Sequence, residues 1–330
     1  MKKAAICFTP QGKRIIERIN SYLEEHETEK VEAYIINDEM QDKDGFVAFE
    51  GSIYEWAESL YKTHALIFVC ATGIAVRAMA GLINDKLSDN PVIVMDDAGR
   101  FVIPLSAGHV GGANKLALTL AKILDAIPVI TTSTDVNEAF SADVFAMEKN
   151  LRIVNREGIK KVSAKAIEGK PVTISVKDYP PKERVDVIIA DSTDKEYTLL
   201  LSPKPYTVGI GMKKNTDIKK AEEVILNILN ENAITTDMIY AFCTIDIKQD
   251  EEALIYLRDR YRIPLITFDA ALLNKADGEF TSSDFVKQTV GVDNVCERAA
   301  VLAAGNGSEL ILNKLSRDGI TVAIAKRKRF

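Results

Sequence analysis

The sequence predicts an α/β protein in which two α/β domains with mostly parallel sheets are joined by a small α+β middle segment. Short apolar runs alternate with segments whose apolar residues recur at helical spacing, and this alternation is typical of βαβ units. The pattern covers residues 1–138 and returns over residues 205–330. Between them, residues 139–204 carry more charge and alternating runs, such as residues 171–176, that indicate a few strands and one helix.

The amino-terminal domain is expected to be built from successive strand and helix pairs. The apolar run at residues 65–70 predicts a central parallel strand, because such strands are covered on both faces. The pattern Asp-Ala-Gly at residues 97–99 suits a hairpin turn. In chain order we expect a strand at residues 4–8, a helix over 13–24, and strands at 31–36, 65–70, 90–95, 101–103 and 127–132.

The carboxyl-terminal domain is expected to begin with a strand at residues 206–211. Two prolines within residues 200–205 indicate a linker before it. Gly209 and Gly211 give only weak support for a nucleotide site, because the third glycine of the dinucleotide fingerprint is missing. A short hairpin that turns at residues 318–319 is expected near the end of the chain.

Composition excludes several classes of protein. The chain has 330 residues and a net charge of -6, which argues against a general nucleic-acid binder, since phosphate contacts need a basic face. No apolar run reaches the ~20 residues of a membrane span. The four cysteines lie far apart without a paired spacing, so neither a zinc site nor a disulfide framework is expected. A reducing cytoplasm is the simplest compartment, and the oligomeric state stays open, with a homodimer as one possibility.

The stretch PLSAGHVGGANK at residues 104–115 is the main candidate for a functional loop. It lies between an apolar run and a helix-like segment, which predicts a strand, a loop and a helix. Its glycines Gly108, Gly111 and Gly112 allow tight turns and a close approach of the backbone to a ligand. The N–H groups of the loop and of the helix start would then face an anion or an oxyanion. The alternative reading is an ordinary turn with His109 facing solvent.

Polar residues follow other expected strands as well. Thr72, Gly73 and Arg77 come after residues 65–70, where ligands of open α/β sheets collect. Asp96 and Asp97 follow residues 90–95. Asp135 and Asn137 follow residues 127–132, with helix capping as their alternative role.

Several motifs together resemble the CbiG family of cobalamin biosynthesis, the cobalt-precorrin-5A hydrolases. In the amino-terminal part they are ATGIAVR at residues 71–77, DDAGRFVIPLSAGHVGGAN at 96–114 and PVITTSTD at 128–135. In the carboxyl-terminal part they are VGIG at residues 208–211, GVDNVCE at 291–297 and AAG at 303–305. One departure is the turn Met212-Lys-Lys214, because members often carry a cysteine and arginines there.

The resemblance implies opening of the ring-A δ-lactone of a cobalt-bearing macrocycle and release of its C20 carbon with the attached methyl group as acetaldehyde. His109 would be the base, with Asp96, Asp97 or Asp135 orienting it, and the N–H groups of residues 110–113 would stabilise the oxyanion. We expect the cobalt to arrive with the substrate, so that no cofactor and no protein metal site are needed. The residues expected to bind the carboxylate-rich substrate are Thr72, Gly73, Arg77, Arg100, Ser106, Gly108, Gly111, Gly112, Lys115, Gly211, Lys213 and Lys214.

Two other functions remain open from the sequence. A tetrapyrrole-binding or carrier module would use the same loops to hold carboxylates without catalysis. A nucleotide-dependent α/β enzyme is disfavoured, because the phosphate-binding fingerprints are missing.

Overall fold

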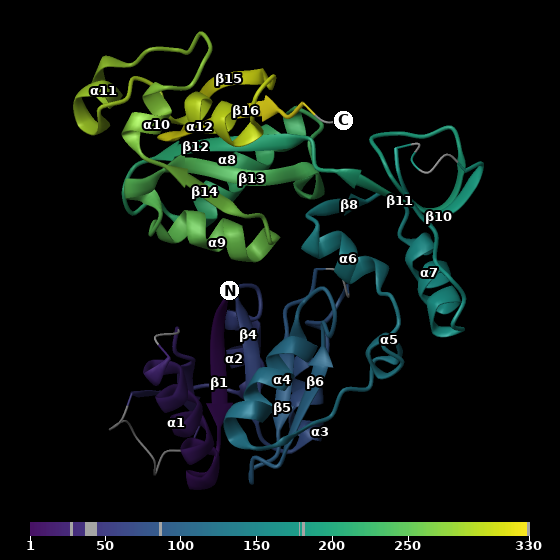
Figure 1. Ribbon diagram of the computed structural model, residues 1–330. Helices are drawn as coiled ribbons and strands as arrows, with labels where there is room; N and C mark the ends of the chain where they lie inside the picture. The colour runs from purple at the N-terminus through teal and green to yellow at the C-terminus, as the bar shows by residue number, and fades with distance from the viewer. Residues whose placement is uncertain (27–28, 37–44, 86–87, 178, 180–181, 329–330) are drawn as a thin grey trace. The chain divides into compact units, whose positions relative to one another are not determined.

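The structure is a computed structural model that describes residues 1–26, 29–36, 45–85, 88–177, 179 and 182–328. Its strands form three separate sheets of seven, four and five strands. In Figure 1 the colour of the ribbon follows the chain from purple at the N-terminus to yellow at the C-terminus. No helix among these residues has the length and apolar character to cross a membrane.

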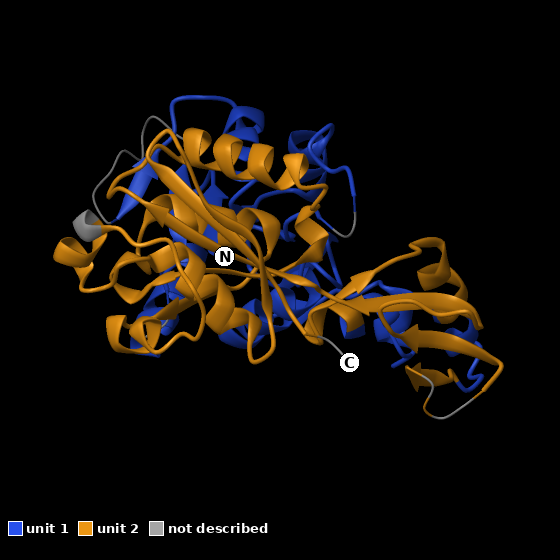
Figure 2. Ribbon diagram, turned by 90° about the horizontal axis from the view of Figure 1, so that it is seen from above, with its two compact units in different colours: residues 1–145, 163–171 blue, residues 146–162, 172–330 orange. Residues whose placement is uncertain are grey.

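The chain divides into two compact units (Figure 2). The first contains Met1–Phe145 and Ser163–Pro171, and the second contains Ala146–Val162 and Val172–Phe330. The four-stranded sheet falls between the other two sheets in sequence, as expected for a middle segment. The domain boundaries at residues 138/139 and 204/205 stay a prediction.

The seven-stranded sheet of the first unit has the order β3-β2-β1-β4-β5-β6-β7. Its strands are β1 (Lys2–Cys7), β2 (Glu32–Ile35), β3 (Phe46–Ala48), β4 (His64–Val69), β5 (Val92–Met95), β6 (Phe101–Ser106) and β7 (Ile127–Pro128). Neighbours in this order pair parallel except β5 and β6, which pair antiparallel. The predicted α/β class with a mostly parallel sheet is confirmed, while β3 was not predicted.

Helices cover both faces of this sheet. α1 (Pro10–Glu25) and α4 (Ala113–Leu124) pack against one face, and α2 (Ile53–Leu60) and α3 (Thr72–Met79) pack against the other. α1 buries Ile15, Ile16, Ile19 and Leu23, whose spacing places them on one side of a helix. The short helices α5 (Ser133–Val136) and α6 (Ala142–Glu148) follow β7.

β6 runs antiparallel to β5, so β6 ends at the edge of the sheet where β5 begins. Met95 at the end of β5 pairs with Val102, and Val92 at its start pairs with Ser106. The loop after β6 therefore lies at the edge where β4 and β5 begin. β7 runs parallel to β6, so the segment after β7 reaches the same edge as this loop.

The second unit contains the two smaller sheets, with orders β8-β11-β10-β9 and β14-β13-β12-β16-β15. The first of them consists of β8 (Leu151–Ile153), β9 (Ile174–Val176), β10 (Arg184–Ile189) and β11 (Glu196–Pro203). The second consists of β12 (Tyr206–Met212), β13 (Ile239–Ile245), β14 (Leu265–Phe268), β15 (Glu309–Arg317) and β16 (Ile320–Lys326). The expectation of a linker at residues 200–205 is wrong for most of these residues, because β11 continues to Pro203 and β12 begins at Tyr206.

The remaining helices lie in or beside this unit. α7 (Glu157–Ile167) precedes β9, and the others are α8 (Ile218–Glu231), α9 (Glu252–Tyr261), α10 (Ala270–Asn274), α11 (Asp284–Val290) and α12 (Val295–Ala304). α8 and α9 bury their apolar side chains on one face of the five-stranded sheet, and α10 and α12 cover the other. The predicted hairpin near the chain end is confirmed as β15 and β16.

Gly209 lets α12 pack directly on β12. A Cβ atom on residue 209 would lie 1.8 Å from the carbonyl oxygen of Cys296. We therefore expect Gly209→Ala to push α12 away from the sheet and to lower the free energy of unfolding by roughly 1–3 kcal/mol or more. Urea denaturation followed by circular dichroism measures this.

Gly73→Ala is the matched control, since its added methyl group would meet only the end of the Arg77 side chain at 3.5 Å. Equal midpoints for the two variants would contradict the packing role of Gly209.

Candidate active site

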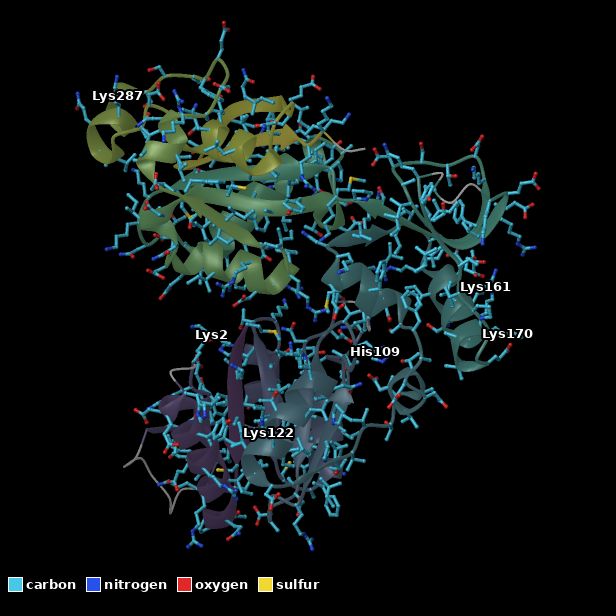
Figure 3. The ribbon with its side chains drawn as sticks, viewed as in Figure 1. Lys2, His109, Lys122, Lys161, Lys170 and Lys287 are labelled. Atoms are coloured by element: carbon cyan, nitrogen blue, oxygen red, sulfur yellow. The ribbon has the colours of Figure 1, made fainter. Side chains whose placement is uncertain are left out.

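The loop between β6 and α4 is a compact turn that its glycines make possible. The N–H of Gly112 donates to the carbonyl of His109 at 2.8 Å, and that of Ala113 donates to the carbonyl of Ala107 at 3.0 Å. A Cβ on residue 111 would lie 2.2 Å from the Cβ of Ala107, so only glycine fits there. Gly112 has a φ of 85°, which glycine adopts at little cost. Figure 3 labels His109, which this loop carries.

The Nε2 atom of His109 faces two oxygens from α5. It lies 2.6 Å from Oδ2 of Asp135 and 2.8 Å from Oγ1 of Thr134. These residues come from the segment after β7, which the parallel pairing of β6 and β7 brings to the same edge of the sheet. Of the three carboxylates that the sequence left open as partners of His109, Asp135 is the one that contacts it, and its catalytic role stays a prediction.

Asn114, on the first turn of α4, holds Asp135 in place. Its Nδ2 donates to Oδ2 of Asp135 at 2.8 Å and to Oγ1 of Thr132 at 3.1 Å. Its Oδ1 is buried and has no hydrogen-bond partner among the described residues. A Cβ on Gly108 would lie 2.9 Å from that oxygen, so Gly108 makes room for the Asn114 amide. The sequence motif contains Asn114, but nothing in its spacing indicated this contact.

A second carboxylate lies on the other side of the His109 ring. Nδ1 is 3.4 Å from Oγ of Ser141 and 3.8 Å from Oδ1 of Asp143. The hydroxyl of Ser141 also donates to Oδ1 of Asp143 at 2.5 Å. The side chain of Asp143 is only 4% exposed. Neither residue was predicted, because both fall just after the end expected for the amino-terminal domain.

The two carboxylates favour the protonated form of His109. The pKa of the imidazole is raised above its ordinary value, first by Asp143 and then by Asp135, while partial burial opposes the rise. A ring with acceptor oxygens near both nitrogens satisfies them best when both carry a proton. This environment favours a proton donor, whereas the sequence had suggested a base, and the catalytic role of His109 stays a prediction.

Backbone donors are available next to His109. The expectation that residues 110–113 supply N–H groups is wrong for Gly112 and Ala113, whose N–H groups bond to carbonyls inside the loop. Those of Val110 and Gly111 have no partner within the part of the chain that the structure describes. These two groups can still stabilise an oxyanion.

The other predicted residues of this unit fall into two groups. Ser106 and the exposed Lys115 lie at the same edge as His109, at the end of β6 and the start of α4. Thr72, Gly73 and Arg77 follow the end of β4, at the opposite edge, and all three are exposed. Six-residue β6 separates the two edges by about 17 Å. The sequence had not distinguished between them.

Asp96 and Asp97 do not orient His109, and that expectation is wrong. The carboxylate of Asp96 accepts the N–H groups of Arg100 and Phe101, both at 2.7 Å, in the turn between β5 and β6. Although partial burial opposes it, these hydrogen bonds lower the pKa of Asp96. Asp97 accepts a hydrogen bond from Thr9 at 2.5 Å. Both carboxylates lie at the edge opposite to His109, and Arg100 shares that turn.

The predicted residues of the second unit are described within that unit alone. Gly211 has a packing explanation, because a Cβ there would lie 2.5 Å from Oγ1 of Thr321, which donates to the Gly211 carbonyl at 3.1 Å. Lys213 and Lys214 are exposed in the turn before α8. Their contact with a substrate stays a prediction.

Thiols and clustered metal ligands do not contribute to the site. All four cysteines are buried and free, and burial raises the pKa of the Cys70 thiol to about 11. No group of three or more histidine, cysteine, aspartate or glutamate side chains among the described residues is arranged to hold a metal ion. The fold and the site together define an α/β protein with a histidine–carboxylate acid–base centre.

Comparison with known proteins gives the family. The family descriptions "Cobalamin synthesis G N-terminal" and "Cobalamin synthesis G C-terminus" match residues 55–135 and 206–325. Cobalt-precorrin-5A hydrolase of Salmonella typhimurium is 32% identical, covering 97% of this chain and 96% of that protein. The chain belongs to the cobalt-precorrin-5A hydrolase family, called CbiG.

The chain is also similar to two further proteins. The cobalt-precorrin-5A hydrolase of Priestia megaterium is 27% identical over 98% of this chain and 94% of that protein. The crystal structure of a putative cobalamin biosynthesis protein G homolog from Sulfolobus solfataricus has 23% identity and a TM-score of 0.38, covering 99% of this chain and 97% of that one.

The raised pKa of His109 makes the stability of the protein depend on pH. Its ion pairs should stabilise the folded state fully below the unfolded imidazole pKa of about 6.5. This contribution is lost as the pH rises through the higher folded-state value. We expect the melting temperature of the wild type to exceed that of His109→Gln most at mildly acidic pH. The difference should shrink as the pH rises from about 6.5 through the folded-state pKa of His109.

His26→Gln controls for the loss of an imidazole at the exposed residue that caps the C-terminus of α1. A difference between wild type and His109→Gln that grows with pH would contradict the assignment of His109 as a cation.

Proposed function

We propose that this protein opens the ring-A δ-lactone of cobalt-precorrin-5A and releases C20 as acetaldehyde, giving cobalt-precorrin-5B. Relatives with that name, which align over nearly the whole chain, support the choice of reaction. The observation that carries the mechanism is the ring of His109, held by Asp135 at 2.6 Å beside the N–H groups of Val110 and Gly111.

In the first step water adds to the lactone carbonyl, the ring C–O bond breaks, and the new carboxylic acid releases the proton that came from the water to the solvent as it becomes a carboxylate. The N–H groups of Val110 and Gly111 would stabilise the negative charge on the carbonyl oxygen. The imidazolium of His109 would protonate the departing alkoxide oxygen, which becomes an alcohol on C20. The pKa of His109 is raised, and this keeps a proton available for the transfer.

In the second step the same alcohol loses its proton. The neutral His109 left by the first step would remove it, the bond from C20 to the macrocycle would break, and the macrocycle would accept the electron pair. Acetaldehyde leaves. His109 regains its proton and is ready for the next turnover, so one side chain can act first as acid and then as base at one oxygen.

The substrate carries many carboxylates, so the protein needs cations to hold it. Lys115 lies at the His109 edge, and we propose that it contacts one carboxylate there, with Lys213 and Lys214 as further contacts. Arg77 and Arg100 are exposed at the other edge and would contact more distant groups only. Cobalt enters with the substrate, the protein needs no cofactor of its own, and we place the reaction in the cytoplasm.

Replacing His109 tests the catalytic proposal. With purified protein and cobalt-precorrin-5A, His109→Ala should slow acetaldehyde release roughly 10²- to 10⁴-fold, the usual contribution of a general acid–base group. The variant should be less stable, because Asp135 and Asp143 lose their ion-pair partner, and circular dichroism at the assay temperature checks that it is folded.

His26→Ala is the matched control, since it removes an exposed histidine elsewhere in the same unit. Wild-type turnover in His109→Ala would remove His109 from the mechanism. Tight binding of the macrocycle by the wild type without any acetaldehyde would favour the carrier function instead.

The role of the cations can be tested by affinity. Exposed ion pairs contribute ~0–1 kcal/mol each and are screened by salt, so Lys213→Ala with Lys214→Ala should weaken substrate binding by up to roughly 30-fold, and less at high salt. Titration of the substrate into each protein measures this.

Lys160→Ala with Lys161→Ala is a suitable control, because these two adjacent lysines on α7 are also exposed. Equal losses in both double variants, or an affinity that does not change with salt, would contradict a specific contact.

A further inference from the structure

The two nitrogens of the His109 ring have unequal surroundings. Nε2 has close partners at 2.6 and 2.8 Å, from Asp135 and Thr134. Nδ1 has no partner nearer than Oγ of Ser141 at 3.4 Å, with Asp143 behind it at 3.8 Å. Nε2 is therefore held by short contacts, whereas the contacts at Nδ1 are longer and weaker.

Asp143 and Ser141 form a unit of their own at the start of α6. Oδ1 of Asp143 accepts hydrogen bonds from the Ser141 hydroxyl at 2.5 Å and from the N–H of Val144 at 3.1 Å. A carboxylate that is 4% exposed needs such donors and a nearby cation to stay charged. His109 is the cation, and the Ser141 hydroxyl lies within reach of both its ring and the carboxylate.

We propose that Asp143 and Ser141 are positioning residues for the reaction: they fix the His109 ring from the Nδ1 side and place a negative charge beside it that favours the imidazolium. This rests on the function proposed above. Asp135 on α5 and Asp143 on α6 are the charged groups that face the ring among the described residues, and Thr134 and Ser141 are its neutral partners. The raised pKa of the imidazole, with Asp143 as its first cause, supports this arrangement.

The arrangement makes separate predictions for the two ring nitrogens. Without the Asp143 charge, His109 should keep its Nε2 contact with Asp135 but release its Nδ1 proton at lower pH. Without the Ser141 hydroxyl, Asp143 remains, but the hydroxyl that lies between its carboxylate and Nδ1 of His109 is lost. Both changes should reduce turnover more than substrate binding, because neither residue is expected to touch the substrate.

The test combines NMR titration of the histidine rings with acetaldehyde release. The chain has three histidines, so the His109 signals can be assigned with His109→Gln. In Asp143→Asn the His109 titration should move to lower pH, kcat should fall roughly 10- to 100-fold, and the rate profile should move with the titration. Ser141→Ala should lower kcat similarly, and Ser141→Thr, which keeps the hydroxyl, should restore most of it.

Glu148→Gln is the matched control, because it removes an exposed carboxylate from the same helix. The proposal is overturned if Asp143→Asn titrates as the wild type does, or if its titration moves while kcat stays within about 2-fold. If Asp143→Asn does not fold, the two Ser141 variants decide by the same readouts. A wild type that releases no acetaldehyde would refute the proposed function. The titration of the His109 ring needs no substrate, so it would still test the contact between Asp143 and His109.

Discussion

The reversal of the chain between β5 and β6 decides which residues can share a site in the first unit. Asp96 accepts two backbone N–H groups in that turn and stabilises the reversal. A parallel strand in this place would need a long crossover, and it would bring the following loop to the edge where β1 and β4 end. The antiparallel strand brings His109 to the opposite edge, where the segment after β7 supplies the Asp135 carboxylate.

That position gives His109 an electrostatic environment suited to acid catalysis. Carboxylates from α5 and α6 lie on its two sides, at 2.6 Å from Nε2 and 3.8 Å from Nδ1. Each favours the imidazolium, and the raised pKa is the sum of their effects against burial. In the proposed reaction a proton donor acts before a base, and the raised pKa of His109 suits that order.

The sequence predicted the α/β class, most strands of the first unit, and the loop that carries His109. These predictions depend on the spacing of apolar residues and of glycines, which are local properties of the chain. It also predicted Asp135, which follows an apolar run as ligands of α/β sheets commonly do. It failed for Asp96 because the consequence of the hairpin for strand direction is not local. Asp143 was missed since its partner lies 34 positions earlier in the chain, and no pattern within residues 139–150 indicates that contact.

Glycines show the same division between local and tertiary causes. Gly112 is explained by its own backbone conformation, which a loop before a helix makes plausible from the sequence. Gly209 and Gly211 resemble part of a nucleotide-binding motif in sequence. In the structure they pack against Cys296 and Thr321, which are more than 80 residues away in the chain. Only the packing of α12 and β16 against β12 gives the reason for them.

The position of the cobalt ion in a complex tests the central claim most directly. A crystal of the His109→Ala protein with bound cobalt-precorrin-5A would locate the metal by its anomalous scattering, without any assumption about the macrocycle. We expect the cobalt at the edge of the first sheet where β6 ends, with the ring-A lactone beside residues 108–111 and Thr134. Cobalt at the opposite edge, beside Thr72 and Arg77, would contradict the account.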